Sequence, residues 1–226
     1  MSPAPPPSHP TDRPAPPTTP EFISPYRQQR PMLLVLENEV DRDKRYFVPE
    51  ISRHLPEHRV HDVAHGDVPK IDALTDVADS ARDHESELDG VILSGSTAGV
   101  YESSDYPWMD DLRTLVRSLV DAEIPTLGVC FGHQLANDAL GGSVEHRGLT
   151  AELVDAELAD DPLFDGVSST LPMVHGDHVT ELGERMEPIA SADYYPYLGS
   201  RHEDAPLWTV QYHPEFTDRL LPRIAD

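Results

Sequence analysis

Short, largely apolar runs recur along the chain and predict the strands of a buried sheet. The first comprises residues 32–36, Met-Leu-Leu-Val-Leu, and similar runs follow at 60–63, 90–93 and 126–129. Apolar runs of this length without strict alternation are typical of strands that are covered on both faces. We therefore expect these segments to lie side by side in the interior of the protein.

Helical patterns fill the gaps between these runs. The clearest spans 109–122, where apolar residues recur at the spacing of one helical face, and a second follows at 134–140. Strands that alternate with helices imply right-handed crossovers and a parallel sheet with helices on both faces. The expected fold is a three-layer α/β domain with a mostly parallel central sheet. Its active site is expected at the carboxyl ends of the strands.

The pattern changes after Gly142, where shorter alternating pieces replace the helices. These pieces lie at 151–158, 188–190 and 207–212. Short pieces with alternating apolar positions are typical of strands and hairpins. The second half of the domain is therefore expected to add antiparallel strands to the sheet.

Proline dominates the amino-terminal segment. The first 31 residues hold 11 of the 23 prolines and few large apolar side chains. Such a segment cannot bury enough surface to offset the entropy lost on ordering. We expect residues 1–30 to form a disordered tail and residues 31–226 to form one domain. A docking site for a proline-binding partner is the alternative for the tail.

Composition limits the class of protein. The 226 residues include one cysteine, so an intrachain disulfide framework and a zinc site of several thiolates are both excluded. No stretch approaches the roughly 18 apolar residues of a membrane span, and the amino terminus lacks the apolar segment of about 7 to 15 residues of a signal peptide. We expect a soluble, cytoplasmic protein without membrane partners.

The net charge is strongly negative. Asp and Glu number 41 against 17 Lys and Arg, which gives a formal charge of −24. Such a charge repels phosphate backbones and argues against nucleic acid as a partner. Lysine occurs only as Lys44 and Lys70. An acidic surface poor in lysine favours adaptation to a salty cytoplasm, where salt screens the self-repulsion; an ordinary acidic protein is the alternative.

The segment 128–134, Gly-Val-Cys-Phe-Gly-His-Gln, carries the strongest chemical signal. It lies where a predicted strand ends and a helical pattern begins. A nucleophile at a sharp strand-to-helix turn needs small neighbours, and Gly128 and Gly132 flank Cys130. The start of a helix also favours the thiolate form of a cysteine. The pattern favours a nucleophilic cysteine over a buried structural one.

A thiolate nucleophile works with a base, and His213 is the best placed of the 12 histidines. The preceding residues 208–212 have the pattern of a strand in the same sheet, and Pro214 stops that strand at the histidine. Glu215 lies two residues further on and can orient the imidazole. A structural role is the alternative for a single histidine, and the pairing with Cys130 favours catalysis.

These two segments resemble the motifs of the class I glutamine amidotransferases. The family's nucleophile motif GxCxGxQ matches residues 128–134, and its closing motif HPE matches residues 213–215. The resemblance implies the family's flavodoxin-like fold and an enzyme that needs no cofactor. It also implies a triad that hydrolyses the side-chain amide of glutamine through a glutamyl thioester and releases ammonia. The triad consists of Cys130, His213 and Glu215.

The resemblance spans roughly residues 32–215 and implies further site residues. The backbone amides of Phe131 and Ser96 would stabilise the oxyanion of the tetrahedral intermediate, since residues 91–96 resemble the family's oxyanion strand. The family's Gly-Gly-Pro turn here is Gly95-Ser96-Thr97, so the second donor depends on backbone angles that serine can adopt. The implied substrate-binding residues are Gly95, Gln134, His175, Gly176 and Asp177.

The segment 173–178 is expected to be a loop. It contains metal-ligand types at His175, Asp177 and His178, but ligands so close together in sequence seldom reach the geometry of a zinc site, so no metal is expected. The resemblance implies that this loop contacts glutamine largely through its backbone, although Val174 replaces the family's usual serine. A simple turn without function is the alternative.

The sequence predicts a glutaminase domain that supplies ammonia to another protein. The 226 residues show no ATP-binding loop or second domain, so the synthetase that the resemblance implies would be a separate ATP-dependent subunit, with GMP synthetase as the first candidate. A freestanding γ-glutamyl hydrolase or peptidase with the same triad is one alternative. A thiol hydrolase or chaperone of a related fold is disfavoured because it would not need the HPE segment. A non-catalytic interaction subunit is a third alternative.

Overall fold

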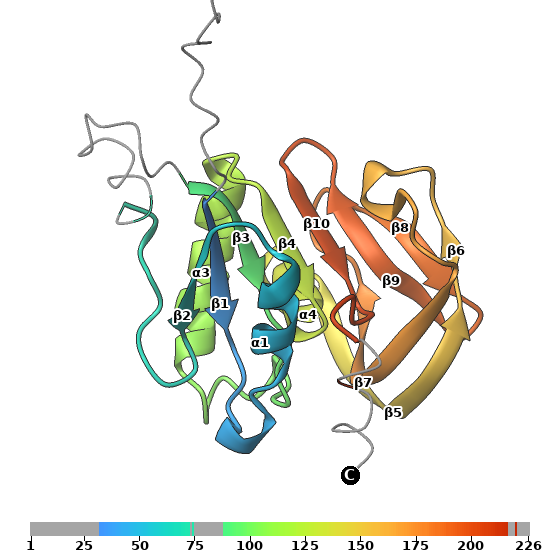
Figure 1. The fold of residues 1–226 in the computed structure, drawn as a ribbon, viewed down its shortest axis with the longest axis horizontal. Helices are drawn as coiled ribbons and strands as arrows, with labels where there is room; N and C mark the ends of the chain where they lie inside the picture. Colours follow the sequence, from blue (N-terminus) through green and yellow to red (C-terminus); the bar gives the residue numbers. More distant parts are fainter. Residues whose placement is uncertain (1–31, 73, 75–87, 217–219, 221–226) are drawn as a thin grey trace, which may run out of the picture.

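A computed structural model describes residues 32–72, 74, 88–216 and 220. The predicted tail, residues 1–30, lies outside these ranges. Within them the chain forms an eight-stranded sheet and a separate two-stranded sheet. Figure 1 shows the larger sheet crossing the molecule, with the two-stranded sheet at the side of its later strands.

The larger sheet has a parallel half and an antiparallel half. Its order is β2-β1-β3-β4-β10-β9-β8-β6. The parallel strands are β2 (His58–Asp62), β1 (Met32–Glu37), β3 (Leu88–Leu93), β4 (Thr126–Val129) and β10 (Leu207–Val210). The antiparallel strands are β9 (Tyr195–His202), β8 (Met186–Ala192) and β6 (Glu157–Leu158). The predicted mostly parallel sheet with added antiparallel strands is confirmed.

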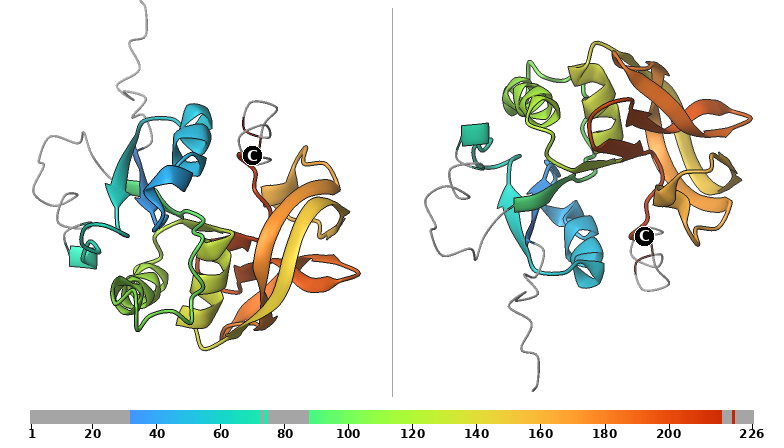
Figure 2. Two further views of the ribbon diagram at one scale, coloured as in Figure 1. Left: turned by 90° about the horizontal axis from the view of Figure 1, so that it is seen from below. Right: turned by 90° about the horizontal axis from the view of Figure 1, so that it is seen from above.

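Helices cover both faces of the parallel half, as the two views of Figure 2 show. On one face lie α3 (Trp108–Asp121) and α4 (Phe131–Ala139). The other face is covered by α1 (Phe47–Ile51), which lies between the short 3-10 turns η1 (Arg42–Lys44) and η2 (Ser52–His54). The predicted three layers are confirmed. Helix α4 begins three residues earlier than the sequence pattern indicated, at Phe131.

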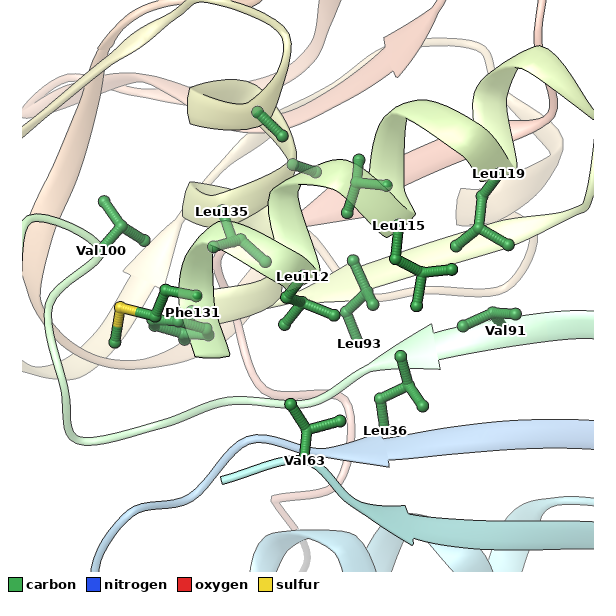
Figure 3. Close-up of a cluster of buried hydrophobic side chains, with 14 of the residues drawn as sticks. Leu36, Val63, Val91, Leu93, Val100, Leu112, Leu115, Leu119, Phe131 and Leu135 are labelled. Atoms are coloured by element: carbon green, nitrogen blue, oxygen red, sulfur yellow. The ribbon is translucent and has the colours of Figure 1, made fainter. Parts of the chain in front are cut away.

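Alternation along the central strands divides the core between these two faces. Leu36 of β1 and Leu93 of β3 are fully buried and pack with α3 and α4, as Figure 3 shows. Their neighbours Val35 and Ile92 point to the opposite face, where they pack with Val48 of α1. Successive residues of a strand point to opposite faces, so a strand in the middle layer must be apolar on both. This explains the continuous apolar runs in the sequence.

One predicted buried strand is wrong. Within the residues that the structure describes, β2 lies at the edge of the sheet and pairs only with β1. Val60 in its centre is 51% exposed, and only Val63, just beyond the strand, is fully buried. The other residues of β2 are polar, which fits an edge strand that faces solvent.

The two-stranded sheet joins β5 (Ser143–Asp155) to β7 (Thr170–Glu181), and η3 (Pro162–Phe164) lies between them in sequence. The predicted loop 173–178 is wrong, because it lies inside β7. Every second residue of β7 is buried; these residues are Leu171, Met173, His175, Asp177 and Val179. Polar side chains at two of the buried positions hid the alternation in the sequence.

The other strands of the second half are close to their predicted positions. The expected strand 151–158 is divided between β5, which begins earlier, and β6. The piece 188–190 lies within β8. The piece 207–212 extends past the end of β10 at Val210. The amide of Gln211 still donates to the carbonyl oxygen of Leu198 in β9, at 2.8 Å, and Tyr212 then leads to His213.

Candidate functional site

Cys130 occupies a strained turn between β4 and α4. Its backbone angles are φ 53° and ψ −107°, a region that residues with side chains rarely adopt. The flanking glycines have no room for side chains. A Cβ on Gly128 would lie 2.5 Å from the carbonyl oxygen of Gly132, and one on Gly132 would lie 2.3 Å from that of Leu93. The turn that presents the thiol therefore depends on both glycines.

The amino-terminal end of α4 follows Cys130 directly. The backbone amides of His133 and Gln134 donate to the carbonyl oxygen of Cys130, at 3.0 and 3.1 Å. The amide of Phe131 has no acceptor among the described residues. Its side chain is buried against Trp108, so only its backbone is free to contribute to the site. Unpaired amides and the helix dipole make this end attractive to negative charge.

His213 and Glu215 form a buried pair. The imidazole Nδ1 donates to Glu215 Oε1 at 2.8 Å, and both side chains are 2% exposed. The ring packs against Phe216 and Phe47, with centroids 4.3 and 5.1 Å away. Its Nε2 lies 3.3 Å from the carbonyl oxygen of Val174. These contacts hold the ring in one orientation.

Strand order brings the nucleophile and this pair together. β4 and β10 are neighbours, and Val129 pairs with Val210, so the residues that follow them leave the sheet at the same edge. Burial lowers the pKa of His213, but the negative charges of Cys130 and Glu215 and hydrogen bonds to both raise it well above the usual value. The site therefore favours a protonated imidazole beside the sulfur.

The turn after β3 brings Gly95 and Ser96 to the same place. A Cβ on Gly95 would lie 3.6 Å from both Cys130 Cβ and His213 Cε1. Ser96 is not among the residues with a positive φ, so a serine fits this position without backbone strain. Its amide has no acceptor within the described ranges. Two unpaired amides, those of Ser96 and Phe131, thus belong to segments that adjoin Cys130.

β7 forms the opposite wall of the site. The side-chain amide of Gln134 donates to the carbonyl oxygen of Asp177 and to the side-chain oxygen of Gln211, both at 3.2 Å. The first bond holds β7 against α4, and the second joins α4 to the segment that follows β10. The sequence placed Gln134 at the substrate, and the structure shows that its amide also joins the two walls of the site.

His175 is a buried, neutral residue of this wall. It is 5% exposed, and its Nε2 hydrogen-bonds the hydroxyl of Tyr194 at 2.9 Å. Its Nδ1 lies 3.1 Å from the carbonyl oxygen of Asp177. Burial lowers its pKa to about 4, so the ring is uncharged near neutral pH.

Of the ten predicted site residues, Gly95, Phe131 and Glu215 do not line the cavity of the site; the other seven surround this cavity, which measures about 580 Å³. It is lined by Gly176, by residues of the triad and by the turn at Ser96, and also by residues that the sequence reasoning missed. The missed residues come from three segments: Lys44, Tyr46 and Phe47 after β1; Thr97, Ala98, Gly99, Tyr101 and Glu102 after β3; and His146 and Leu149 of β5. The segments after β1 and β3 could have been found from one signal in the sequence, because they follow the predicted strands 32–36 and 90–93.

Asp177 connects these segments across the cavity. Its Oδ1 accepts hydrogen bonds from the Tyr101 hydroxyl at 3.2 Å and from His146 Nδ1 at 2.8 Å. One carboxylate thus ties the turn after β3 and strand β5 to β7. Within the described ranges no three His, Cys, Asp or Glu side chains gather as metal ligands. Nor is any helix in that part of the chain long and apolar enough to cross a membrane.

Comparison with known proteins gives a family match. The model for glutamine amidotransferase class-I matches residues 63–221. A glutamine-hydrolyzing GMP synthase from Wolinella succinogenes is 36% identical over 137 residues, which are 57% of this chain and 25% of that protein. The same enzyme from Phenylobacterium zucineum is 34% identical over 173 residues, 73% of this chain and 30% of that protein. The matches therefore cover a quarter to a third of these relatives.

Solved structures share the fold. A glutamine amidotransferase from Thermotoga maritima has a TM-score of 0.65 at 22% identity, over 86% of this chain and 80% of that one. A glutamine amido transferase from Methylobacillus flagellatus has a TM-score of 0.65 at 17% identity, over 86% of this chain and 74% of that one. At these identities the likeness shows the fold alone.

Proposed function

Because the chain belongs to the class I glutamine amidotransferase family, we propose that it hydrolyses the side-chain amide of glutamine to glutamate and ammonia. The observation that carries the proposal is the assembly at the ends of β4 and β10. There the strained Cys130 adjoins the buried pair of His213 and Glu215. An imidazolium beside a sulfur stabilises the nucleophilic thiolate.

Cys130 is the nucleophile of the proposed reaction. Its thiolate attacks the side-chain carbonyl carbon of glutamine, and negative charge moves onto the carbonyl oxygen. The amides of Phe131 and Ser96 donate to this oxyanion, and donors of this kind are worth about 2.7 to 4 kcal/mol each in a measured protease. His213 gives its proton to the departing nitrogen. Collapse of the intermediate releases ammonia and leaves a thioester on Cys130.

His213 is the base of the second half of the reaction. It accepts a proton from water, whose oxygen attacks the thioester carbonyl. Collapse expels the thiolate and releases glutamate, so Cys130 and the imidazolium return to their starting states. Glu215 holds the Nδ1 proton and keeps Nε2 directed away from it, toward the reacting groups. Glutamine lies between Gly95 and the wall formed by Gln134, His175, Gly176 and Asp177.

The ammonia acceptor in this proposal is a separate ATP-dependent synthetase, and GMP synthetase is the first candidate. The curated relatives named above are GMP synthases, and the chain matches a quarter to a third of their length. Ammonia is largely protonated near neutral pH and is then no nucleophile. If ammonia is released directly into an enclosed site of the acceptor, glutamine is not hydrolysed without amination of the acceptor.

Ammonia release by the full chain tests this proposal. We expect slow hydrolysis of glutamine alone and a stimulation of roughly a hundredfold to a thousandfold by GMP synthetase with its nucleotide bound. Cys130→Ala should abolish both activities and leave the fold intact. Unchanged ammonia release from that variant would refute the mechanism. A glutamine-mimicking electrophile should add mass once, because the chain has one cysteine.

A freestanding γ-glutamyl hydrolase is the second candidate. The cavity of about 580 Å³ is within the range of roughly 300 to 1,000 Å³ that holds drug-sized ligands. Its lining includes Tyr101 and Leu149, which are 54% and 76% exposed. Turnover of γ-glutamyl peptides at roughly tens per second without a partner would favour this candidate. A chain that hydrolyses neither substrate, with or without partner, would be a non-catalytic subunit.

A cytoplasmic location is part of the proposal. The nucleophile is a free thiol, and the reducing cytoplasm keeps such thiols reduced. Fractionation of cells and detection of the chain with an antibody would test the location. Recovery outside the cytoplasmic fraction would contradict it.

A further inference from the structure

We propose that Glu39 is a positioning residue for the oxyanion-stabilising amide of Ser96 and that it acts through Thr97. This rests on the proposed glutaminase function. Glu39 follows the carboxyl end of β1, and Cys130 follows the carboxyl end of β4, so both lie at the same end of the parallel strands. Glu39 is not among the residues that line the cavity. Its side chain is buried, at 1% exposure. Its influence on the reaction must therefore pass through the residues that it contacts.

Both carboxylate oxygens of Glu39 bind Thr97. The backbone amide of Thr97 donates to Oε2 at 3.0 Å, and its hydroxyl donates to Oε1 at 2.6 Å. The amide of Asp41 also donates to Oε1, at 2.8 Å, and fixes the carboxylate from its own side. Hydrogen bonds to an ionised carboxylate are stronger than those between neutral groups. One side chain thus holds both the backbone and the side chain of Thr97.

A second attachment holds the other end of the turn. The backbone amide of Asn38 donates to the Ser94 hydroxyl oxygen at 2.9 Å. The side-chain amide of Asn38 donates to the Ser94 carbonyl oxygen at 3.0 Å. Residues 94–97 are therefore held at both ends by two consecutive residues, Asn38 and Glu39. The unpaired amide of Ser96 lies between the two attachments.

The turn needs this support because it contains Gly95. Glycine has the widest backbone freedom of any residue. Rotation about the Cα–C bond of Gly95 changes the direction in which the amide of Ser96 points. Fixing Ser94 and Thr97 restricts that rotation. A misplacement of about 1 Å in a reacting group can cost roughly a hundredfold in rate. Glu39 therefore aims the donor without touching the substrate.

Glu39→Gln in the full chain tests the proposal, and Thr97→Val is the second variant. Glutamine keeps the size of the side chain but offers one acceptor oxygen in place of two, and valine removes only the hydroxyl of Thr97. We expect kcat for glutamine to fall about tenfold to a hundredfold in Glu39→Gln and less in Thr97→Val. KM should stay within about twofold, because the amide acts on the transition state.

An aldehyde inhibitor separates this role from a loss of stability. Glutamate γ-semialdehyde can form a tetrahedral adduct with Cys130 whose oxygen occupies the oxyanion position. Its inhibition constant should rise in each variant by the factor by which kcat/KM falls. Asp161→Asn is the matched control, because Asp161 is also a buried carboxylate that accepts a backbone amide, from Leu163 at 2.9 Å, and it does not line the cavity.

The possible outcomes distinguish this proposal from the proposed function. If the variants lower only the melting temperature, as we expect for Asp161→Asn, the role of Glu39 is structural and the proposal fails. If Glu39→Gln does not fold, the kinetics of Thr97→Val decide, and a kcat and inhibition constant equal to those of the wild type overturn the proposal. If the wild type neither hydrolyses glutamine nor binds the aldehyde, the glutaminase function itself fails.

Discussion

Replacing Glu215 by glutamine removes one negative charge from the site and keeps the shape of the side chain. Glu215 Oε1 lies 2.8 Å from His213 Nδ1, and both side chains are almost fully buried. The glutamine leaves the imidazolium of His213 without its buried negative partner. Its amide group can also donate a hydrogen bond to Nδ1, which favours the imidazole tautomer whose proton is on the other nitrogen.

The size of the effect follows from this geometry. Charge centres about 4 Å apart interact by about 4 kcal/mol at an effective dielectric constant of 20. Without this interaction, the variant needs about 4 kcal/mol more to form the imidazolium that the reaction requires. We therefore expect kcat to fall roughly a thousandfold, since each 1.36 kcal/mol is a factor of ten. The pKa of His213 falls as well, because burial lowers it and only the charge of Cys130 then opposes that effect.

The pH dependence of glutamine hydrolysis measures both effects. Loss of the His213 proton removes the acid that the departing nitrogen needs, so the alkaline limb of the profile should move to lower pH in Glu215→Gln. Glu184→Gln, at an exposed position, is the control. A loss below tenfold with an unmoved alkaline limb would show that Glu215 does not orient the base.

Three further predictions follow from packing, burial and charge. Gly132→Ala should lower the urea midpoint, because its Cβ would lie 2.3 Å from the backbone oxygen of Leu93, and overpacking of this kind costs about 1 to 3 kcal/mol; an unchanged midpoint would contradict the geometry. The free energy of unfolding should fall as the pH drops from about 6.5 to 4. His175 has a pKa of about 4 in the folded chain, so the unfolded chain binds more protons in that window, and stability is present above it and lost below it. Denaturant unfolding at a series of pH values should show a shallower slope in His175→Asn. The melting temperature should rise from dilute buffer to molar potassium chloride, because salt screens the net charge of −24; highest stability in dilute buffer would refute salt adaptation.

Features set by nearby residues were predictable from the sequence. The apolar runs of β1, β3 and β4 are continuous because both faces of these strands are covered, and the helical spacing in α3 marks its buried side. The turn at Cys130 was visible as well, since the glycines that make room for it lie two residues away on either side. Steric requirements of this kind involve residues close together in sequence, so they can be recognised in the sequence itself.

Features set by distant contacts were not predictable. Val60 is apolar, and nothing in the sequence shows that its strand lies at the edge of the sheet. β7 was hidden because His175 and Asp177 are buried by polar contacts with other strands and loops. The turn at Ser96 departs from the family's Gly-Gly-Pro, and the residue that holds it, Glu39, precedes Thr97 by 58 positions.

The strand that leads to the base completes the sheet from within. β10 lies between β4 and β9, although its residues come after both neighbours in the sequence. During synthesis, the two halves of the sheet therefore cannot be joined until β10 has been made. Cys130 likewise cannot contact His213 before that point, because His213 follows β10. Pairing between such distant segments is slow, because a long loop must close first. Under the proposed mechanism, an incomplete chain on the ribosome therefore hydrolyses no glutamine.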